Sequence, residues 1–286
     1  MIRDVKIGGG GVAEVVIGEG RPLTLIAGPC AIESEEHSLF MCAEIKAICE
    51  KLGVQYVFKS CYNKDCRSSH RSFLGLGLDE GLPILAKVRE VHKVPVTSDV
   101  SYVEWVDDTA KVVDLIQLPA YLSRQTALLM AAGATGKPVH IKKGQYMGPW
   151  NMKNAALKVA AQGNDKILLT DRGTFFGYNM LVNDMRCFRI MRETGYPVGY
   201  DVTHSIQLPE SLGTSSGGQR EFIPDLMRAA LGAGVDFLFM EVHDEPAKAL
   251  CDATTQLPLK YLEPLLTQAV AFYELRREMG PIEITE

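Results

Sequence analysis

Strand-like and helix-like segments alternate eight times along the chain, and this alternation constrains the fold more than any other feature of the sequence. Each unit begins with a short run rich in β-branched and aliphatic residues and continues with a longer stretch whose apolar residues recur at helical spacing. Because parallel strands need a helix-sized connection between them, the pattern predicts an α/β fold with a parallel sheet. The predicted strands, which start about 31 residues apart on average, are residues 23–27, 56–59, 94–97, 115–117, 139–142, 166–170, 198–201 and 237–241.

Eight units of this length favour closure into a TIM (β/α)8 barrel over an open doubly wound sheet. The first predicted strand is not followed by the GxGxxG turn that is typical of a dinucleotide-binding fold. Ahead of the barrel, residues 5–7 and 13–17 are predicted to form an N-terminal hairpin around glycines 8–11, which we expect to close the barrel bottom. We therefore expect a single domain over residues 1–286, with 1–22 as the hairpin extension and 23–286 as the barrel. The predicted helices are residues 38–52, 80–91, 103–112, 123–135, 152–162, 182–193, 222–232 and 259–279.

Composition and charge narrow the class of protein. Hydrophobic residues make up 47% of the chain and charged residues 23%, which is enough for a sizeable core. The net charge of -5 is opposite to what a phosphate backbone attracts, so a nucleic-acid partner is not expected. Residues 1–20 lack the apolar core of a signal peptide and no apolar run is long enough to cross a bilayer, so we expect a cytoplasmic protein without a membrane partner. Seven cysteines without a CxxC pair indicate reduced thiols.

Polar residues follow almost every predicted strand. In a barrel of this kind the loops at the carboxyl ends of the strands build the active site, so these residues are candidates for function. A single polar residue at a strand end is common and often only meets solvent, and the set is therefore more informative than its members. In chain order the set is Cys30, Lys59, Asp99, Gln117, Lys143, Arg172, His204 and Glu241.

Barrel closure would bring four potential metal ligands together although they are far apart in the sequence. The eighth strand neighbours both the seventh and the first, so Cys30, His204, Glu241 and the loop that contains Asp252 should meet. A thiolate, an imidazole and two carboxylates suit a divalent metal ion, and zinc, iron(II) and manganese all fit such a set. The alternative interpretation is a buried cysteine, a capping aspartate and an unrelated histidine.

A second group of strand-end residues is cationic. Arginine and lysine at a barrel mouth suit phosphates and carboxylates, so the group indicates one or two small anionic substrates, with surface charge as the alternative. Arg67 followed by Ser68 is the most specific pair, because a guanidinium beside a hydroxyl can hold a phosphate. The group consists of Lys59, Lys64, Arg67, Arg124, Lys143 and Arg172. The role of His243 is open, and His37, His70, His92 and His140 are interpreted as structural or solvent-facing.

From about residue 23 to residue 270 the chain resembles the 3-deoxy-D-manno-octulosonate 8-phosphate synthases. The matching stretches lie mostly at or just after predicted strands: IAGPCAIES (26–34), QLPAYLSRQT (117–126), KKGQYMGPW (142–150), DRGTFFGYN (171–179), DVTHSIQLP (201–209), SSGGQREF (215–222), EVHDEP (241–246) and CDATTQLP (251–258). The resemblance implies a homotetrameric barrel. It also implies the condensation of phosphoenolpyruvate with D-arabinose 5-phosphate, which releases phosphate and yields the acid sugar of lipopolysaccharide.

The resemblance also implies roles for individual residues. The family has metal-dependent and metal-independent branches, marked by Cys or Asn at the position of Cys30, so this chain resembles the metal-dependent branch. The implied ligands are Cys30, His204, Glu241 and Asp252, with Lys143, His204, Asp252 and Cys30 as the catalytic set. The implied phosphoenolpyruvate contacts are Lys143, Arg172, Lys59 and the backbone near Ala120. The implied sugar-phosphate contacts are Lys64, Arg67 and Ser68, with Asp99 and Gln207 near the hydroxyls and Arg124 reaching across a subunit boundary.

Two positions depart from the family pattern and leave the acceptor sugar open. The family usually has Asn where this chain has Cys66, and a thiol is a poor substitute for an amide in hydrogen bonding. Leu74 stands where Arg is common, and the FLGLG stretch at 73–77 is similar to the related heptulosonate-phosphate synthases. One alternative is therefore a synthase that uses erythrose 4-phosphate. Another, of a different class, is a non-catalytic sensor of a phosphorylated ligand.

Overall fold

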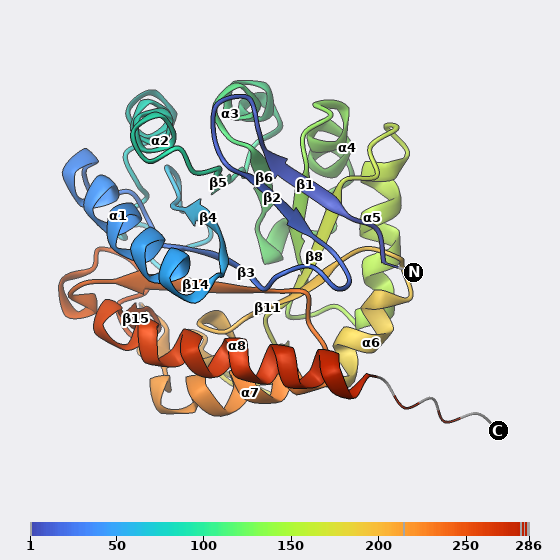
Figure 1. Cartoon of the computed structure of the whole chain (residues 1–286). Coiled ribbons are helices and arrows are strands. Elements are labelled where there is room, and N and C mark those ends of the chain that lie inside the picture. The colour runs from blue at the N-terminus through green and yellow to red at the C-terminus, as the bar shows by residue number, and fades with distance from the viewer. Residues whose placement is uncertain (1, 214, 281, 283, 285–286) are drawn as a thin grey trace.

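The computed structural model describes residues 2–213, 215–280, 282 and 284. Within these residues, eight parallel strands close into a barrel surrounded by α-helices, which confirms the predicted TIM barrel (Figure 1). Closure is achieved by β14, which pairs with β11 on one side and β3 on the other. The barrel strands are β3 (Thr24–Gly28), β4 (Gln55–Lys59), β5 (Val96–Asp99), β6 (Leu115–Leu118), β7 (Val139–Lys142), β8 (Ile167–Asp171), β11 (Val198–Asp201) and β14 (Phe237–His243).

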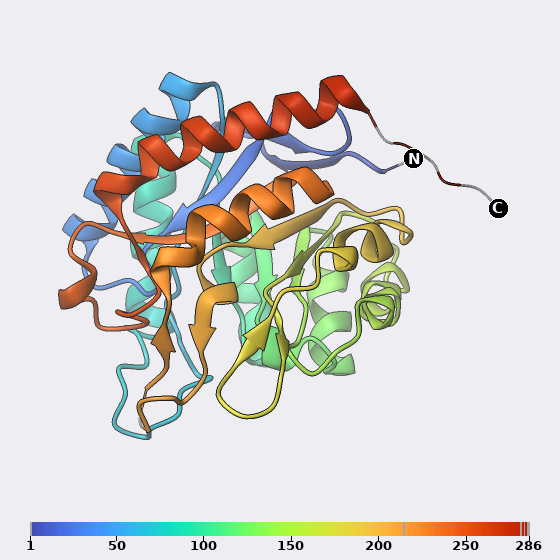
Figure 2. The ribbon, with the colours of Figure 1, turned by 90° about the horizontal axis from the view of Figure 1, so that it is seen from below.

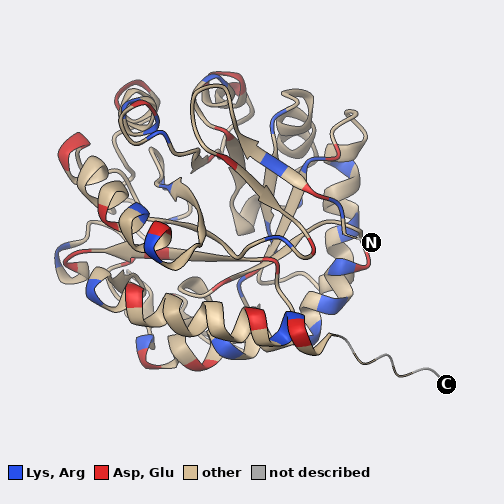
Figure 3. Ribbon diagram, viewed as in Figure 1, with Lys and Arg blue, Asp and Glu red and all other residues tan. Residues whose placement is uncertain are grey.

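Helices follow the barrel strands and cover the outside of the barrel. The first begins at Glu35, three residues before the predicted start, because Ser34 caps it by accepting a hydrogen bond from the His37 N–H group. It ends as predicted at Leu52, followed by Gly53 in the left-handed conformation at φ 67°. Acidic and basic residues are interspersed along these helices (Figure 3). The α-helices are α1 (Glu35–Leu52), α2 (Leu78–His92), α3 (Val106–Val112), α4 (Thr126–Ala134), α5 (Met152–Ala160), α6 (Arg186–Arg192), α7 (Ile223–Ala233) and α8 (Leu262–Met279).

Short 3-10 turns precede several of these helices. They explain why some helices begin a few residues later in the structure than the sequence predicts. Residues Ala120–Leu122 form such a turn ahead of α4, and the Ser123 hydroxyl donates to the Ala120 carbonyl at 2.8 Å. The remaining 3-10 turns are Val103–Trp105, Pro149–Asn151, His204–Ile206, Arg220–Phe222, Pro246–Lys248 and Leu259–Tyr261. Among the helices of the described residues, none combines the length and the apolar character that crossing a membrane requires.

The predicted N-terminal hairpin is present and closes one end of the barrel. Its strands β1 (Val5–Gly8) and β2 (Glu14–Ile17) pair antiparallel. The hairpin's buried side chains form one apolar cluster with residues of the barrel strands, among them Phe237 and Phe239. This cluster fills the amino-terminal end of the barrel interior and leaves the opposite end for polar residues.

Loops after the barrel strands extend from the end opposite the hairpin (Figure 2). One contains the antiparallel pair β9 (Thr174–Phe175) and β10 (Leu181–Val182), so α6 begins at Arg186 and not at the predicted residue 182. A second contains the pair β12 (Gln207–Leu208) and β13 (Gly217–Gly218). Beyond the barrel, β14 continues to His243, where it pairs with β15 (Leu257–Pro258). These loops surround the site described below.

Candidate active site

A cavity of about 560 Å³ opens at the carboxyl ends of the barrel strands, where the sequence pattern predicts a site. Its size is within the range of small-molecule binding sites. Lys59, Asp99 and Gln117 reach it from the ends of β4, β5 and β6. The residues predicted from the sequence that line it are Lys59, Lys64, Arg67, Ser68, Asp99, Gln117, Ala120, Arg172, His204, Gln207, Glu241 and Asp252.

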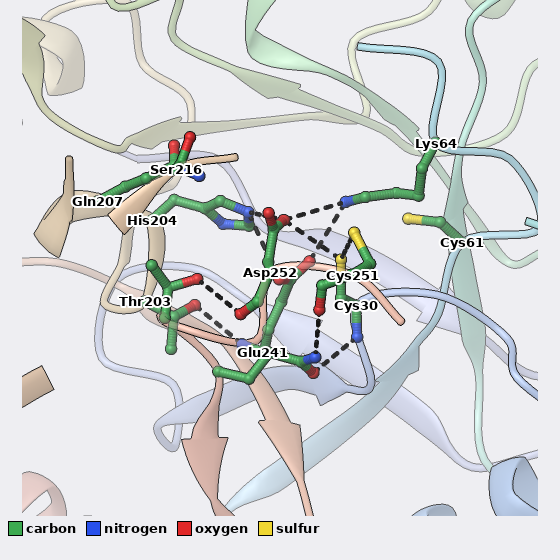
Figure 4. Close-up of polar contacts among 12 residues, drawn as sticks. Cys30, Cys61, Lys64, Thr203, His204, Gln207, Ser216, Glu241, Cys251 and Asp252 are labelled. Carbon is green, nitrogen blue, oxygen red and sulfur yellow. Dashed lines mark hydrogen bonds and ion pairs between the residues drawn. The ribbon is translucent and has the colours of Figure 1, made fainter. Parts of the chain in front are cut away.

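The four residues proposed as metal ligands form one chain of contacts at this cavity (Figure 4). The Cys30 sulfur lies 3.3 Å from Asp252 Oδ2, and that oxygen lies 3.6 Å from His204 Nε2. His204 Nε2 lies in turn 3.5 Å from Glu241 Oε2. The barrel register explains the meeting, because Glu241 pairs with Gly28, two residues before Cys30. Residues separated by more than 200 positions thus share one corner of the cavity.

The donor atoms of this cluster fit a divalent metal ion. Its members offer a thiol, an imidazole and two carboxylates, a combination that binds zinc and other first-row metals. Glu241 Oε2 is buried and has no hydrogen-bond partner, although it faces His204. A buried carboxylate oxygen without a partner is costly, and coordination of a cation would satisfy it.

The surrounding charges keep the carboxylates of the cluster ionised. Burial opposes ionisation of Glu241, but Lys59, Lys64 and His204 lower its pKa to about 2. Burial likewise opposes ionisation of Asp252, whose pKa is held well below its usual range by His204 and Lys64. The thiol behaves in the opposite way: burial, the contact with Cys251 and the charge of Asp252 raise the pKa of Cys30. Coordination to a cation would therefore have to displace the thiol proton.

Cys251 is a member of this corner that the sequence pattern did not single out. Its sulfur lies 2.6 Å from the Cys30 sulfur and 2.9 Å from the Arg67 guanidinium. The adjacent Asp252 has a positive φ of 46°, which is uncommon outside glycine and typical of functional loops. Gln256 fixes the loop by accepting a hydrogen bond from the Cys30 N–H group at 3.0 Å. The only sequence signal for Cys251 near this cluster was that it directly precedes Asp252.

Lysines and arginines line the wall next to the cluster. Lys59 is buried and its ammonium lies 2.6 Å from Glu241 Oε1, with Lys64 at 3.5 Å from the same oxygen. Burial alone would lower the pKa of Lys59, but Cys61 and Glu241 raise it, so this lysine stays charged. Arg67 lies 3.4 Å from Asp252 Oδ1 and has a buried Nε atom without a partner. These cations neutralise the carboxylates and retain donors for an anionic ligand.

The lysine at the end of β7 that lines the cavity is Lys142, whereas Lys143, the residue chosen from the sequence, does not line it. Side chains alternate along a strand, and His140 packs against Phe237 and Phe239 inside the barrel. Lys142 therefore faces the same interior and lines the cavity. The ammonium of Lys143 points away and donates to the carbonyl of Met147 at 3.2 Å and the hydroxyl of Thr174 at 3.1 Å.

Asp201 contacts both His204 and Lys142 at the cavity. The sequence pattern did not predict a role for Asp201. Its Oδ2 lies 2.7 Å from His204 Nδ1 and also accepts a hydrogen bond from Lys142. Burial opposes its ionisation, but His204 and Lys142 hold the pKa of Asp201 well below its usual range. In return, Asp201 and Glu241 raise the pKa of His204 against the effect of burial. The one available signal was that Asp201 is an acidic residue at a strand end.

The remaining predicted residues divide between the cavity and the surface. Arg172 is buried and donates to the Gln207 side chain at 2.7 Å. Asp99 accepts from Gln117 at 2.5 Å and from the Cys61 thiol at 3.2 Å. Arg124 is exposed and does not line the cavity of its own chain, so its expected role across a subunit boundary stays a prediction.

Comparison with known proteins places the chain among a well-populated group. The profile described as the DAHP synthetase I family matches residues 4–276. Several curated relatives, each named 2-dehydro-3-deoxyphosphooctonate aldolase, are similar over nearly their whole length. The relative from Citrifermentans bemidjiense is 52% identical over 271 residues, which cover 95% of this chain and 97% of the relative. Those from Geobacter sp. (strain M21) and Trichlorobacter lovleyi are 52% and 51% identical, covering 93% and 95% of this chain and 96% and 98% of the relatives.

Proposed function

The chain belongs to the DAHP synthetase I family, and we propose that it condenses phosphoenolpyruvate with D-arabinose 5-phosphate and water. The products are 3-deoxy-D-manno-octulosonate 8-phosphate and phosphate, and the pathway is the synthesis of lipopolysaccharide precursors. The observation that carries this proposal is the cavity itself, where five cationic side chains surround a thiol, imidazole and carboxylate cluster. Two phosphorylated substrates require such a concentration of positive charge.

Phosphoenolpyruvate is proposed to bind between Lys59, Lys142 and Arg172. Lys142 takes the position that the sequence pattern assigned to Lys143, and the backbone near Ala120 completes this end of the cavity. Arg172 has a planar fork of donors that suits a phosphate or a carboxylate. Its buried guanidinium is held by the His204 carbonyl at 3.2 Å and by Gln207, so it is positioned before substrate enters.

The sugar phosphate is proposed to bind at the opposite end, among residues of the loop between β4 and α2. Lys64, Arg67 and Ser68 line the cavity there and offer ammonium, guanidinium and hydroxyl donors. Asp99 and Gln207 also line the cavity, and we propose that they meet the sugar hydroxyls. We propose that the sugar aldehyde then lies between the two groups of cations.

In the proposed reaction, C3 of phosphoenolpyruvate forms a bond to the aldehyde carbon, and the aldehyde oxygen takes up a proton to become a hydroxyl. Water adds at C2 and gives up one proton, which balances the proton taken up by the aldehyde oxygen. Phosphate then leaves with the electrons of its bond to C2 and takes the second proton of the added water, which leaves the keto group. Lys142 is our candidate for the proton donor, because burial lowers its pKa to about 8 although Asp201 opposes this. The fixed charges of Lys59 and Arg172 stabilise the charge that develops on the phosphate and carboxylate.

We further propose that the enzyme is metal-dependent, with Cys30, His204, Glu241 and Asp252 as the ligands. The donor set and the unpartnered Glu241 oxygen support this assignment. The chemistry that a divalent ion supplies in such a site is the polarisation of a substrate oxygen and a lowered pKa of a bound water. Zinc, iron(II) and manganese all suit these ligands.

Chelation and replacement of Cys30 test the metal proposal. Removal of metal should abolish phosphate release by the wild type, and addition of a divalent ion should restore it. The Cys30→Asn variant carries the residue of the metal-independent branch and should keep activity that does not respond to chelator. Full activity of metal-stripped wild-type protein would contradict metal dependence and leave the condensation reaction untouched.

Phosphate release with a panel of aldose phosphates tests the condensation itself. We expect release from phosphoenolpyruvate with D-arabinose 5-phosphate and much slower release with erythrose 4-phosphate. A preference for erythrose 4-phosphate would indicate a heptulosonate-phosphate synthase. Binding of phosphoenolpyruvate by calorimetry without release with any aldose phosphate would indicate a sensor.

We also propose that the enzyme is a cytoplasmic homotetramer. Its seven free cysteines suit a reducing compartment. Tyr121, Tyr146 and Trp150 are 47%, 45% and 67% exposed, and Tyr146 donates to the Tyr121 carbonyl close to Arg124. Exposed aromatic groups of this kind are typical of surfaces that another subunit covers. Light scattering should give the mass of four chains and cell fractionation should recover the enzyme with the cytosol; a monomer or a membrane fraction would contradict the proposal.

A further inference from the structure

A second cluster of metal-ligating residue types lies outside the cavity, where α1 begins and β14 ends. Ligand atoms of Glu33, His37 and His243 lie within 4.8 Å of one another, and none of these three residues lines the cavity. His243 is 3% exposed, and the centroids of the two imidazole rings are 4.6 Å apart. The continuation of β14 to His243 therefore does not bring this ring to the candidate catalytic cluster; it brings it to His37.

Asp244 accounts for one nitrogen of each ring. Its Oδ1 lies 3.1 Å from His37 Nε2 and 2.9 Å from His243 Nδ1. A carboxylate only accepts, so each of these nitrogens carries the ring proton when it bonds to Asp244. In the other tautomer of His243, Nδ1 accepts from the Glu245 N–H group at 3.0 Å, but its lone pair then faces the Asp244 carboxylate. Only this second tautomer gives the Glu245 N–H group an acceptor and directs the Nε2 proton at Glu33, so it is the one that the metal-free ring adopts. A cation that binds Nε2 would shift this proton to Nδ1, where Asp244 Oδ1 can accept it.

The two nitrogens opposite Asp244 are left without partners. His37 Nδ1 and His243 Nε2 are both buried and neither has a hydrogen-bond partner. His243 Nε2 lies 3.4 Å from Glu33 Oε1, where its proton makes only a long contact with the carboxylate. A buried His37 lone pair beside a poorly paired imidazole and a carboxylate is unfavourable alone, and coordination of a cation would satisfy all three groups.

We propose that Glu33, His37 and His243 bind a divalent transition-metal ion, with Asp244 orienting both imidazoles. A histidine that binds a metal through one nitrogen usually donates its other N–H to a carboxylate, and Asp244 serves both rings in this way. Two imidazoles and a carboxylate suit Zn²⁺, Co²⁺ or Ni²⁺ better than Mg²⁺, which prefers oxygen ligands. The site is distinct from the Cys30 cluster and does not rest on the proposed function.

The position of this site gives it a structural role. Glu33 follows Cys30 by three residues, and His243 follows Glu241 by two. The third segment is attached through Glu33 Oε1, which accepts a hydrogen bond from the Leu250 N–H group at 3.0 Å, two residues before Asp252. An ion held here would fasten together the three segments that carry Cys30, Glu241 and Asp252.

Metal content of the full chain tests the proposal. Protein stripped by chelator is dialysed against Co²⁺ and the bound ions are counted by elemental analysis. We expect His37→Ala and Glu33→Gln proteins each to hold one ion per chain fewer than the wild type. Asp244→Asn should lower the affinity for that ion about 10- to 100-fold, because loss of an orienting carboxylate usually has an effect of this size. Asp225→Asn, at an exposed residue paired with Arg228, is the matched control and should leave the content unchanged.

The absorption spectrum of bound Co²⁺ separates the two sites. Thiolate ligation at Cys30 produces a sulfur-to-cobalt charge-transfer band, whereas imidazole and carboxylate ligation produces only d–d bands. His37→Ala should therefore lose d–d intensity and keep the charge-transfer band. In Cys30→Ser protein, Co²⁺ should raise the melting temperature, and the added His37→Ala change should remove that increase. Equal ion contents in the wild type, His37→Ala and Glu33→Gln proteins would overturn the proposal.

Discussion

The Nδ1 atom of His204 lies 2.7 Å from Oδ2 of Asp201, and this buried contact fixes which face of the imidazole meets the cavity. With Nδ1 engaged, Nε2 is directed toward Glu241 and Asp252, at 3.5 and 3.6 Å. The same carboxylate oxygen accepts from Lys142, so one buried aspartate positions both a proposed metal ligand and a proposed proton donor.

Replacement of Asp201 by Asn should therefore disturb both groups at once. An amide carries no charge to support His204 and Lys142, and we expect metal affinity and kcat/KM for phosphate release each to fall about 10- to 100-fold. Dialysis against Zn²⁺ and a phosphate-release assay measure the two quantities. Asp184→Asn, at a partly exposed residue paired with Arg186, is the control and should change neither. Wild-type affinity and turnover in Asp201→Asn would contradict the positioning role.

The adjacent lysines 142 and 143 should give opposite results when each is replaced by Met. Lys142→Met removes a cavity cation but leaves buried Asp201 paired with His204, so we expect a folded protein whose kcat falls about 10²- to 10³-fold. Lys143→Met removes the partner of buried Asp171, 3.2 Å away, and should lower the free energy of unfolding by about 3–5 kcal/mol. Urea unfolding and phosphate release distinguish the two effects. Loss of turnover in a stable Lys143→Met protein would restore the assignment made from the sequence.

This pair of lysines also shows how far the sequence could predict the structure. The barrel was predictable because strand and helix periodicity are local, and all eight strands match within a few residues. Choosing between two consecutive lysines depends on which face of β7 points inward, and the sequence at a strand end does not decide this. The packing of His140 on Phe237 decides it, through a contact between strands remote in the sequence.

The proposed metal-ligand cluster at the cavity could also be predicted in part from the sequence. Barrel closure brings the ends of the first and last strands together, so Cys30, Glu241 and His204 could be grouped from topology alone. Cys251 and Asp201 could not, because their roles depend on side-chain directions in a loop and at a strand end. The cluster of Glu33, His37 and His243 was missed because it depends on the exact residue at which β14 ends.

The lowered pKa of Lys142 predicts an alkaline limit to activity. If the charged ammonium donates the proton, the active form is present below its pKa of about 8, and turnover should decline as the pH rises through that value. The pH profile of kcat measures this limb. Lys142→Arg keeps the positive charge but cannot give up a proton, so its kcat should fall about 10²- to 10⁴-fold and the activity that remains should show no decline near pH 8. An unchanged limb in that variant would assign the titration to another group.

The thiol of Cys66 should limit the affinity for the sugar phosphate. Cys66 lines the cavity together with Lys64 and Asp99, at the end where the pentose is proposed to bind, and the family pattern that the sequence resembles has Asn at this position. A hydrogen bond from an amide contributes about 0.5–1.5 kcal/mol, so Cys66→Asn should lower KM for D-arabinose 5-phosphate about 2- to 10-fold and leave KM for phosphoenolpyruvate unchanged. Cys66→Ala removes the thiol without adding an amide and should leave both KM values near those of the wild type. Initial rates over a range of both substrates measure these constants, and an unchanged or raised KM for the sugar in Cys66→Asn would mean that this side chain does not contact it.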